Sequence, residues 1–160
     1  MTNQFEDEFS YLQADMISIC LEYVSGKADE IFIHCSYEEE RISCNVFYKI
    51  NNILVRRSKV NDALTIEEKQ VFQYDTSDNK QQQLVHIIND NIDEIAKLCI
   101  AKNLPMPTEM KICYCVKKKS MKAQYCYDLL YSNHPDIRIS DIFQSWFNEI
   151  RSGPLFNPRP

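Results

Sequence analysis

Two runs of sequence decide the fold: Ile31-Phe32-Ile33-His34-Cys35-Ser36-Tyr37 and Ile42-Ser43-Cys44-Asn45-Val46-Phe47-Tyr48-Lys49-Ile50. In both runs large or apolar side chains recur at every second position, which is the period of a half-buried β-strand. The acidic corner Glu38-Glu39-Glu40 joins the two runs, and Asn51-Asn52, which tolerate the positive φ of tight hairpins, turn the chain into a third strand over 53–60. Residues 29–60 are therefore predicted to form a three-stranded meander that is covered on one side.

A helix is predicted ahead of this meander. Asn3 can cap it together with Glu6, three residues later, and Gly26 ends it. Apolar side chains recur between these points at intervals of three and four residues: Phe5, Phe9, Leu12, Met16, Ile19 and Tyr23. We expect this stripe to cover the sheet rather than to form a coiled coil, because it spans fewer than four heptads.

Two more helices are predicted after the meander. Thr65 and Glu68 form a capping box for a short helix that runs to about Tyr74. A longer helix follows the polar stretch 75–80 and ends before Pro105. One face of the longer helix is apolar and carries Leu84, Ile87, Ile88, Ile92, Ile95, Leu98 and Cys99.

The last third of the chain predicts a second hairpin and a final helix. Residues 110–127 return to the two-residue period on either side of the basic turn Lys117-Lys118-Lys119-Ser120. A bulky apolar face follows, with two possible helix starts at Pro135 and Ser140 and an end at Gly153-Pro154: Ile139, Ile142, Phe143, Trp146, Phe147 and Ile150. The element order α-β-β-β-α-α-β-β-α favours an α+β fold in which helices cover an antiparallel sheet of about five strands.

Composition predicts a single domain over residues 1–160, with a loosely held tail over 155–160. The chain has only two glycines, and its apolar runs are shorter than a membrane span. Seven cysteines at mostly apolar-alternating positions, with no secretory signal peptide ahead of them, indicate a reducing cytoplasm. A net charge of -5 argues against nucleic acid as a direct partner and favours a basic protein.

Signatures of chemistry are sparse. Cys113 and Cys115 lie two residues apart, but zinc sites favour C-x-x-C pairs and a second such pair elsewhere. A Cys/His pair could be built from Cys35 or Cys126, yet it would need an activated thiolate and a third orienting group. Phosphate-binding glycine loops and metalloprotease motifs do not occur. The sequence therefore predicts no enzyme activity, no catalytic residue, no metal and no cofactor.

Acidic surface patches are the more informative feature. The corner of Glu38, Glu39 and Glu40 is expected to expose three carboxylates, and Asp90, Asp93 and Glu94 add a second group on the long helix. Exposed carboxylates of this kind raise the association rate with a basic partner and orient it. These six residues are the candidate binding site, although a solvated turn and a solvated helix face are the simpler interpretations.

Three segments resemble the YezG-type antitoxin and immunity family. They are residues 31–59, with Phe47-Tyr48-Lys49 at the centre; residues 110–130, which end Gln124-Tyr125-Cys126-Tyr127-Asp128-Leu129-Leu130; and Ser145-Trp146-Phe147-Asn148-Glu149 before Gly153-Pro154. The resemblance implies a small cytoplasmic bacterial protein that binds a cognate toxin delivered by secretion or cell contact. Such toxins are commonly nucleases, and the family member neutralises its toxin by stoichiometric binding without doing chemistry itself.

Two other functions remain open. The same element order and acidic charge resemble the small chaperones of type III secretion, which hold an effector segment in extended form and are obligate dimers. A hydrolase that uses Cys35 or Cys126 would instead show a thiol that is hyper-reactive at neutral pH. The oligomeric state, the toxin and the face that meets it are not determined by these residues.

Overall fold

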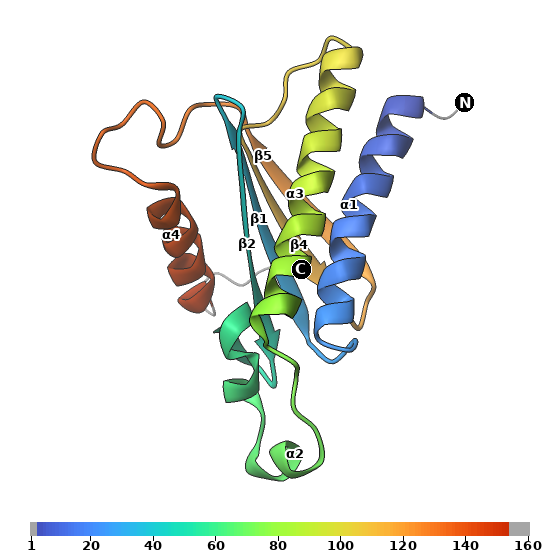
Figure 1. Ribbon diagram of the computed structural model, residues 1–160, viewed down its shortest axis with the longest axis vertical. Helices are drawn as coiled ribbons and strands as arrows, with labels where there is room; N and C mark the ends of the chain where they lie inside the picture. Colours follow the sequence, from blue (N-terminus) through green and yellow to red (C-terminus); the bar gives the residue numbers. More distant parts are fainter. Residues whose placement is uncertain (1–2, 154–160) are drawn as a thin grey trace.

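The computed structural model describes residues 3–153, and Figure 1 shows helices packed on an antiparallel sheet. The five strands are ordered β3-β2-β1-β4-β5, and each neighbouring pair is antiparallel. The predicted α+β class, the strand number and the antiparallel arrangement are therefore confirmed. The elements are α1 (Gln4–Tyr23), β1 (Glu30–Glu38), β2 (Arg41–Ile50), β3 (Ile53–Arg56), η1 (Arg57–Ala63), α2 (Ile66–Val71), α3 (Asp78–Ala101), β4 (Glu109–Cys115), β5 (Ser120–Cys126) and α4 (Ile139–Arg151).

The central hairpins form where the sequence predicts them. Glu39 and Glu40 turn β1 into β2 with φ of 51° and 64°, and Asn51 and Asn52 turn β2 into β3 with φ of 52° and 65°. Two successive residues with positive φ match the right-handed twist of the flanking strands. The third strand is shorter than expected, because the 3-10 helix η1 begins at Arg57.

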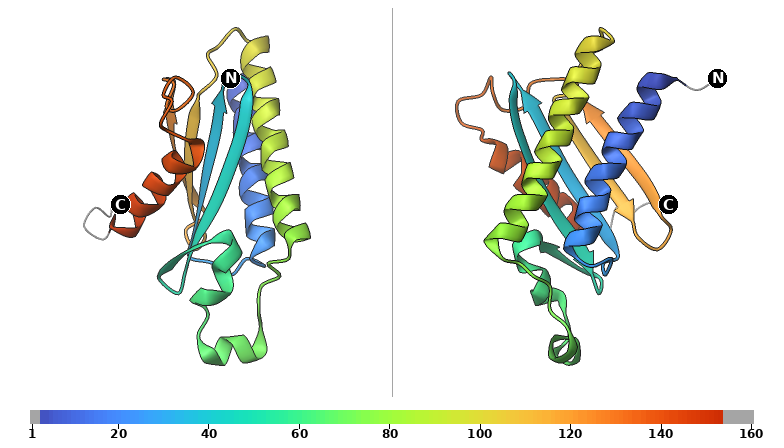
Figure 2. Two further views of the ribbon diagram at one scale, coloured as in Figure 1. Left: turned by 60° about the vertical axis from the view of Figure 1, so that its left-hand side comes forward. Right: turned by 45° about the vertical axis from the view of Figure 1, so that its right-hand side comes forward.

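One face of the sheet packs against α1 and α3, which lie side by side and run in opposite directions (Figures 1 and 2). The predicted alternation holds here, because the apolar side chains of β1 and β2 point into this layer. Its fully buried members include Ile31, Ile33, Val46 and Tyr48 from the strands and Met16, Ile88, Ile92 and Ile95 from the helices. This layer is the larger of the two cores.

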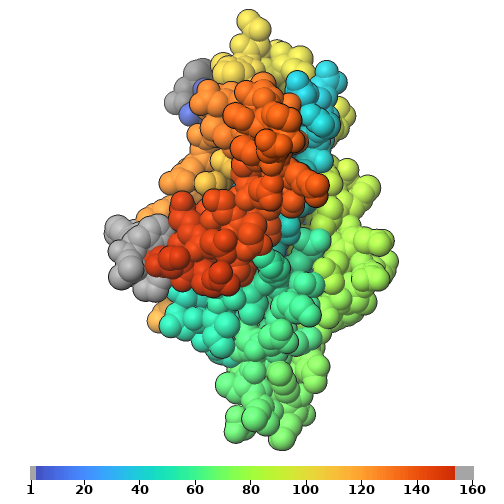
Figure 3. All heavy atoms as spheres, turned by 90° about the vertical axis from the view of Figure 1, so that its left-hand side faces the viewer, coloured from blue at the N-terminus to red at the C-terminus, as the bar shows by residue number. Residues whose placement is uncertain are grey.

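The opposite face of the sheet is covered as well, so the expectation that helices cover only one side is wrong. Helix α4 lies across it, as the left view of Figure 2 and the space-filling view of Figure 3 show. Phe32 and Phe47 stack with ring centroids 4.7 Å apart, and Trp146 meets the Phe47 ring edge-on at 5.1 Å. Phe143 and Phe147 complete this second core, with Ile150 packed against it. The rings of Phe32 and Phe47 are therefore buried by a second apolar layer, which α4 provides.

The remaining elements differ from the predictions only at their ends. The capping box of Thr65 and Glu68 is present, but α2 ends at Val71 rather than near Tyr74. Helix α2 has no buried residue and projects below the body of the molecule (Figure 1). The predicted tail 155–160 lies outside the described residues. Across residues 3–153 no helix is long and apolar enough to cross a membrane.

Candidate protein-binding surface

The α1/α3 layer carries the excess negative charge of the chain. The two helices together have nine acidic side chains and two lysines, Lys80 and Lys97. The rest of the sequence has 14 acidic and 16 basic residues, because the whole chain has 23 and 18. Charge is therefore segregated: the outer side of one helical layer is strongly acidic, and the remainder is slightly basic.

The predicted acidic group on α3 lies on this layer. Asp90 and Glu94 are exposed and Asp93 is half-buried. Lys97 bridges two of them, with its Nζ 3.1 Å from Asp93 and 3.4 Å from Glu94. These contacts raise the pKa of Lys97, and the hydrogen bond to Asp93 has the largest effect. The structure thus brings the three carboxylates onto one exposed region, where exposed ion pairs neutralise them only partly.

The predicted acidic corner is not an exposed group of three carboxylates. Glu38 is only 1% exposed, so its assignment to an exposed binding surface is wrong. As the last residue of β1 it points to the α4 face, where its carboxylate accepts hydrogen bonds from the backbone N–H groups of Leu130, Tyr131 and Ser132. Glu38 therefore anchors the segment between β5 and α4, which lies beside the hairpin corner in Figure 3.

The exposed part of the corner is small. Glu39 and Glu40 are exposed, and Arg41 Nη2 lies 2.9 Å from the Glu39 carboxylate. One of the two remaining carboxylates is therefore paired with a cation. The corner contributes less negative charge than either helix, and it is secondary to the α1/α3 layer as a binding surface.

Helix α1 contributes acidic residues that we did not single out from the sequence: Glu6, Asp7, Glu8, Asp15 and Glu22. All five are exposed. A signal was present, because no lysine or arginine precedes Lys27. The apolar stripe of this segment predicts the helix, and its acidic residues lie outside that stripe.

An exposed aromatic side chain lies within the acidic row of α1. Asp7, Tyr11 and Asp15 follow one another at intervals of four residues and so share one side of the helix. Tyr11 is 71% exposed. Asn91 of α3 donates a hydrogen bond of 2.9 Å to Asp15, which places this row next to α3. Tyrosine is enriched among the residues that dominate binding energy at interfaces, so the row combines charge with a potential anchor.

Two buried polar residues of the sheet contact each other. His34 Nε2 lies 2.8 Å from a Glu109 carboxylate oxygen, and both residues are buried beside α4. Burial raises the pKa of the Cys35 thiol well above its ordinary value, so the thiolate needed for nucleophilic chemistry is disfavoured. Among residues 3–153, no three His, Cys, Asp or Glu side chains are grouped as metal ligands.

Helix α4 and the acidic layer lie on opposite faces of the sheet (Figure 2). Helix α4, which carries Trp146, thus belongs to the second core, whereas the exposed carboxylates lie on the outer side of the two helices that cover the first core.

Comparison with known proteins adds no family to this description: no family model matches the chain, and no curated protein is significantly similar to it.

Proposed function

We propose that this protein is an immunity protein that binds a basic toxin domain, through its acidic α1/α3 layer, and neutralises it stoichiometrically in the bacterial cytoplasm. The observation that carries the proposal is the segregation of charge, with nine acidic side chains and two lysines on two adjacent helices. The likeness of the two hairpins and of the final helix to the YezG-type family supports a toxin as the partner.

Electrostatics explain why such a layer suits a nuclease. A nuclease holds phosphates with lysine and arginine, so its active cleft is a positive surface. Carboxylates on two rigid helices can occupy that surface in place of phosphates, and complementary charge increases the rate of encounter by about 10- to 1000-fold. Tyr11, exposed within the row of Asp7 and Asp15, supplies apolar contact area in the same place.

The direct test is co-expression with the basic C-terminal domain of a large secreted protein, which we expect the neighbouring reading frame to encode. Rescue of the cells should rise with the dose of this protein and reach its limit near equal amounts of the two chains. Rescue at strongly sub-stoichiometric levels would point to an enzyme and would overturn the proposal.

A second candidate, a secretion chaperone, is favoured by one observation. Strand β5 is at the edge of the sheet and exposes Met121 and Tyr125, with Tyr127 exposed just beyond it. An extended segment could pair with such an edge through main-chain hydrogen bonds. Size-exclusion chromatography with light scattering separates the two proposals, because an obligate dimer is expected of the chaperone and one-to-one binding of a folded domain is expected of the immunity protein.

A further inference from the structure

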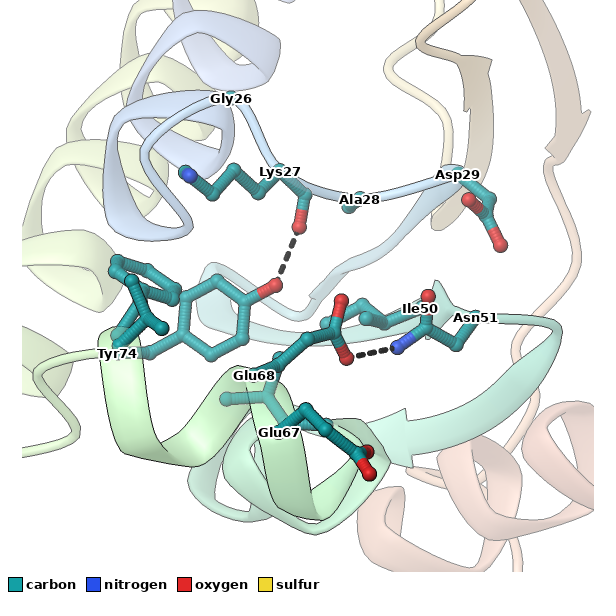
Figure 4. A pocket seen from close by; sticks show the side chains of 12 residues that line it. Gly26, Lys27, Ala28, Asp29, Ile50, Asn51, Glu67, Glu68 and Tyr74 are labelled. Carbon is teal, nitrogen blue, oxygen red and sulfur yellow. Dashed lines mark hydrogen bonds between the residues drawn. The ribbon is translucent and has the colours of Figure 1, made fainter.

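A cavity of about 600 Å³ lies next to the loop that follows the C-terminal end of α1. Figure 4 shows its walls, which come from the loop after α1, the turn between β2 and β3, and helix α2 with the residues that flank it. The Tyr74 hydroxyl donates a hydrogen bond of 2.6 Å to the Lys27 carbonyl and ties two of these walls together. The cavity is thus assembled from three segments that are distant in sequence.

Its inner surface is largely apolar. Ile50, Leu64 and Tyr74 line it and are buried, and Phe72 packs edge-on against Tyr74 with ring centroids 4.8 Å apart. Val71, which is 88% exposed, stands on the α2 side. Such a surface can hold an alkyl chain, because burying each methylene group of a ligand is favourable.

The lining of the cavity is negatively charged. Asp29, Glu67 and Glu68 contribute carboxylates, and Lys27 contributes the one cation among the lining residues. Asp29 accepts a hydrogen bond from the backbone N–H of Asn52, and Glu68 accepts one from the Asn51 amide. These donors are uncharged, so they orient the two carboxylates without neutralising them, whereas the nearby Lys27 cation acts on the charge of Glu68.

One further feature favours a positive group at this place, and one existing contact competes with it. Helix α1 points the negative end of its dipole toward the cavity, and its last turn contains no basic residue. Lys27 Nζ lies 4.7 Å from the centroid of the Phe72 ring, so a cation of the chain itself already covers this aromatic lining residue. The Phe72 ring therefore binds a cation, and a positive group from a partner has to displace Lys27 from it.

We propose that this cavity receives one lysine or arginine side chain of the protein partner, with its methylene groups against Ile50, Leu64 and Phe72 and its cation at the carboxylates of Asp29, Glu67 and Glu68. The proposal rests on the proposed function for the identity of that partner as a basic protein. It adds a single anchoring pocket to what is otherwise a diffuse acidic surface, and it gives the projecting helix α2 a role.

The test uses the full chain and a small probe. The probe Nα-acetyl-arginine amide should shift the backbone amide resonances of Gly26, Asn51 and Val71 in an NMR titration. The uncharged isostere Nα-acetyl-citrulline amide should shift them at least fivefold less at equal concentration. Equal shifts with the two probes, or no shift at these amides with the arginine probe, would overturn the proposal.

Three variants sharpen the result. Glu67→Gln should weaken binding of the arginine probe about two- to fivefold, as expected for loss of one exposed ionic contact. Glu6→Gln removes the same charge about 30 Å away along α1 and should leave binding unchanged. Lys27→Met removes the competing cation and should tighten binding about two- to fivefold. Equal effects of Glu67→Gln and Glu6→Gln, or weaker binding by Lys27→Met, would contradict the proposal.

Failure of this proposal and failure of the proposed function give different results. If the probe binds the cavity but co-expression gives no rescue, the proposed pocket stands and the proposed immunity function fails. If co-expression gives rescue but the probe does not bind, the proposed immunity function stands and the proposed pocket fails.

Discussion

Glu38 and Ser132, which are 94 positions apart in sequence, are joined by a hydrogen bond of 2.7 Å from the serine hydroxyl to the carboxylate. Three backbone N–H groups of Leu130, Tyr131 and Ser132 donate to the same carboxylate. The end of the central strand β1 thus holds the segment that leads into α4. A residue that the sequence placed on a binding surface is instead part of the framework of the fold.

Glu38→Gln should destabilise the protein by about 1.5–3 kcal/mol, because hydrogen bonds to a charged acceptor are lost and an amide N–H₂ faces backbone donors. Urea unfolding measures this change. Glu39→Gln is the matched control, since Glu39 is exposed, and it should change stability by less than about 0.5 kcal/mol. Equal effects of the two variants would show that the Glu38 contacts do not stabilise the fold.

The same carboxylate predicts a pH dependence. Burial alone would raise the pKa of Glu38, but its hydrogen bonds from Ser132, Leu130 and Tyr131 outweigh this effect and hold the pKa below 4.5, its ordinary value. A carboxyl whose folded pKa is lowered stabilises the fold above its unfolded pKa, and this contribution is lost as the pH falls through the folded pKa. The stability difference between wild type and Glu38→Gln should therefore be constant from pH 7 to about 5 and shrink below about 4.5. A difference that stayed constant down to pH 3 would contradict this assignment.

Trp146→Ala should cost about 3–5 kcal/mol, because the indole fills the core between α4 and the sheet and is only 4% exposed. The free energy of urea unfolding is the measurement. Ile66→Ala, at a residue of α2 that is 75% exposed, is the control and should cost less than about 0.5 kcal/mol. An unchanged melting temperature for Trp146→Ala would show that α4 is not an integral part of the fold.

Thiol reactivity tests the catalytic alternative. Burial raises the pKa values of Cys20 and Cys35, and it raises the pKa of Cys44 to about 12, so these thiols should stay protonated at neutral pH. Labelling of the native protein with iodoacetamide at pH 7 should be slow at all three, and full labelling should require unfolding. Rapid reaction at Cys35 would instead support a hydrolase that uses this thiol.

Much of the fold follows from local patterns. The two-residue alternation of Ile31 to Ile50 predicted both central strands and the side that faces α1 and α3, and the Asn51-Asn52 turn fixed the register of β3. The second face was harder to predict. Ser43, Asn45 and Lys49 alternate onto that face and predict that it is polar, whereas Phe32 and Phe47, which stack across β1 and β2, bury it under α4. That contact depends on a helix about 100 residues away, which no local pattern shows.

The candidate site was only partly predictable for a related reason. Three consecutive glutamates read as a solvated turn, yet Glu38 belongs to the strand and meets donors from a distant segment. The group on α3 was found because its carboxylates lie close together in sequence. The carboxylates of α1 come next to them only when the two helices pack, as the contact of Asn91 with Asp15 shows.

The central claim is that the acidic layer of α1 and α3 meets a basic toxin, and association kinetics test it most directly. Three exposed charges of the layer are removed together in one variant: Asp7→Asn, Glu22→Gln and Asp90→Asn. Three exposed charges outside α1 and α3 are removed in its control: Asp62→Asn, Asp136→Asn and Glu149→Gln.

Both variants are measured by surface plasmon resonance, at low and high salt, against the toxin domain that we expect the neighbouring reading frame to encode. The layer variant should associate roughly tenfold more slowly than the control at low ionic strength, and the two rates should converge as salt screens the charges. Equal association rates of the two variants at every ionic strength would contradict the claim and place the toxin on another face.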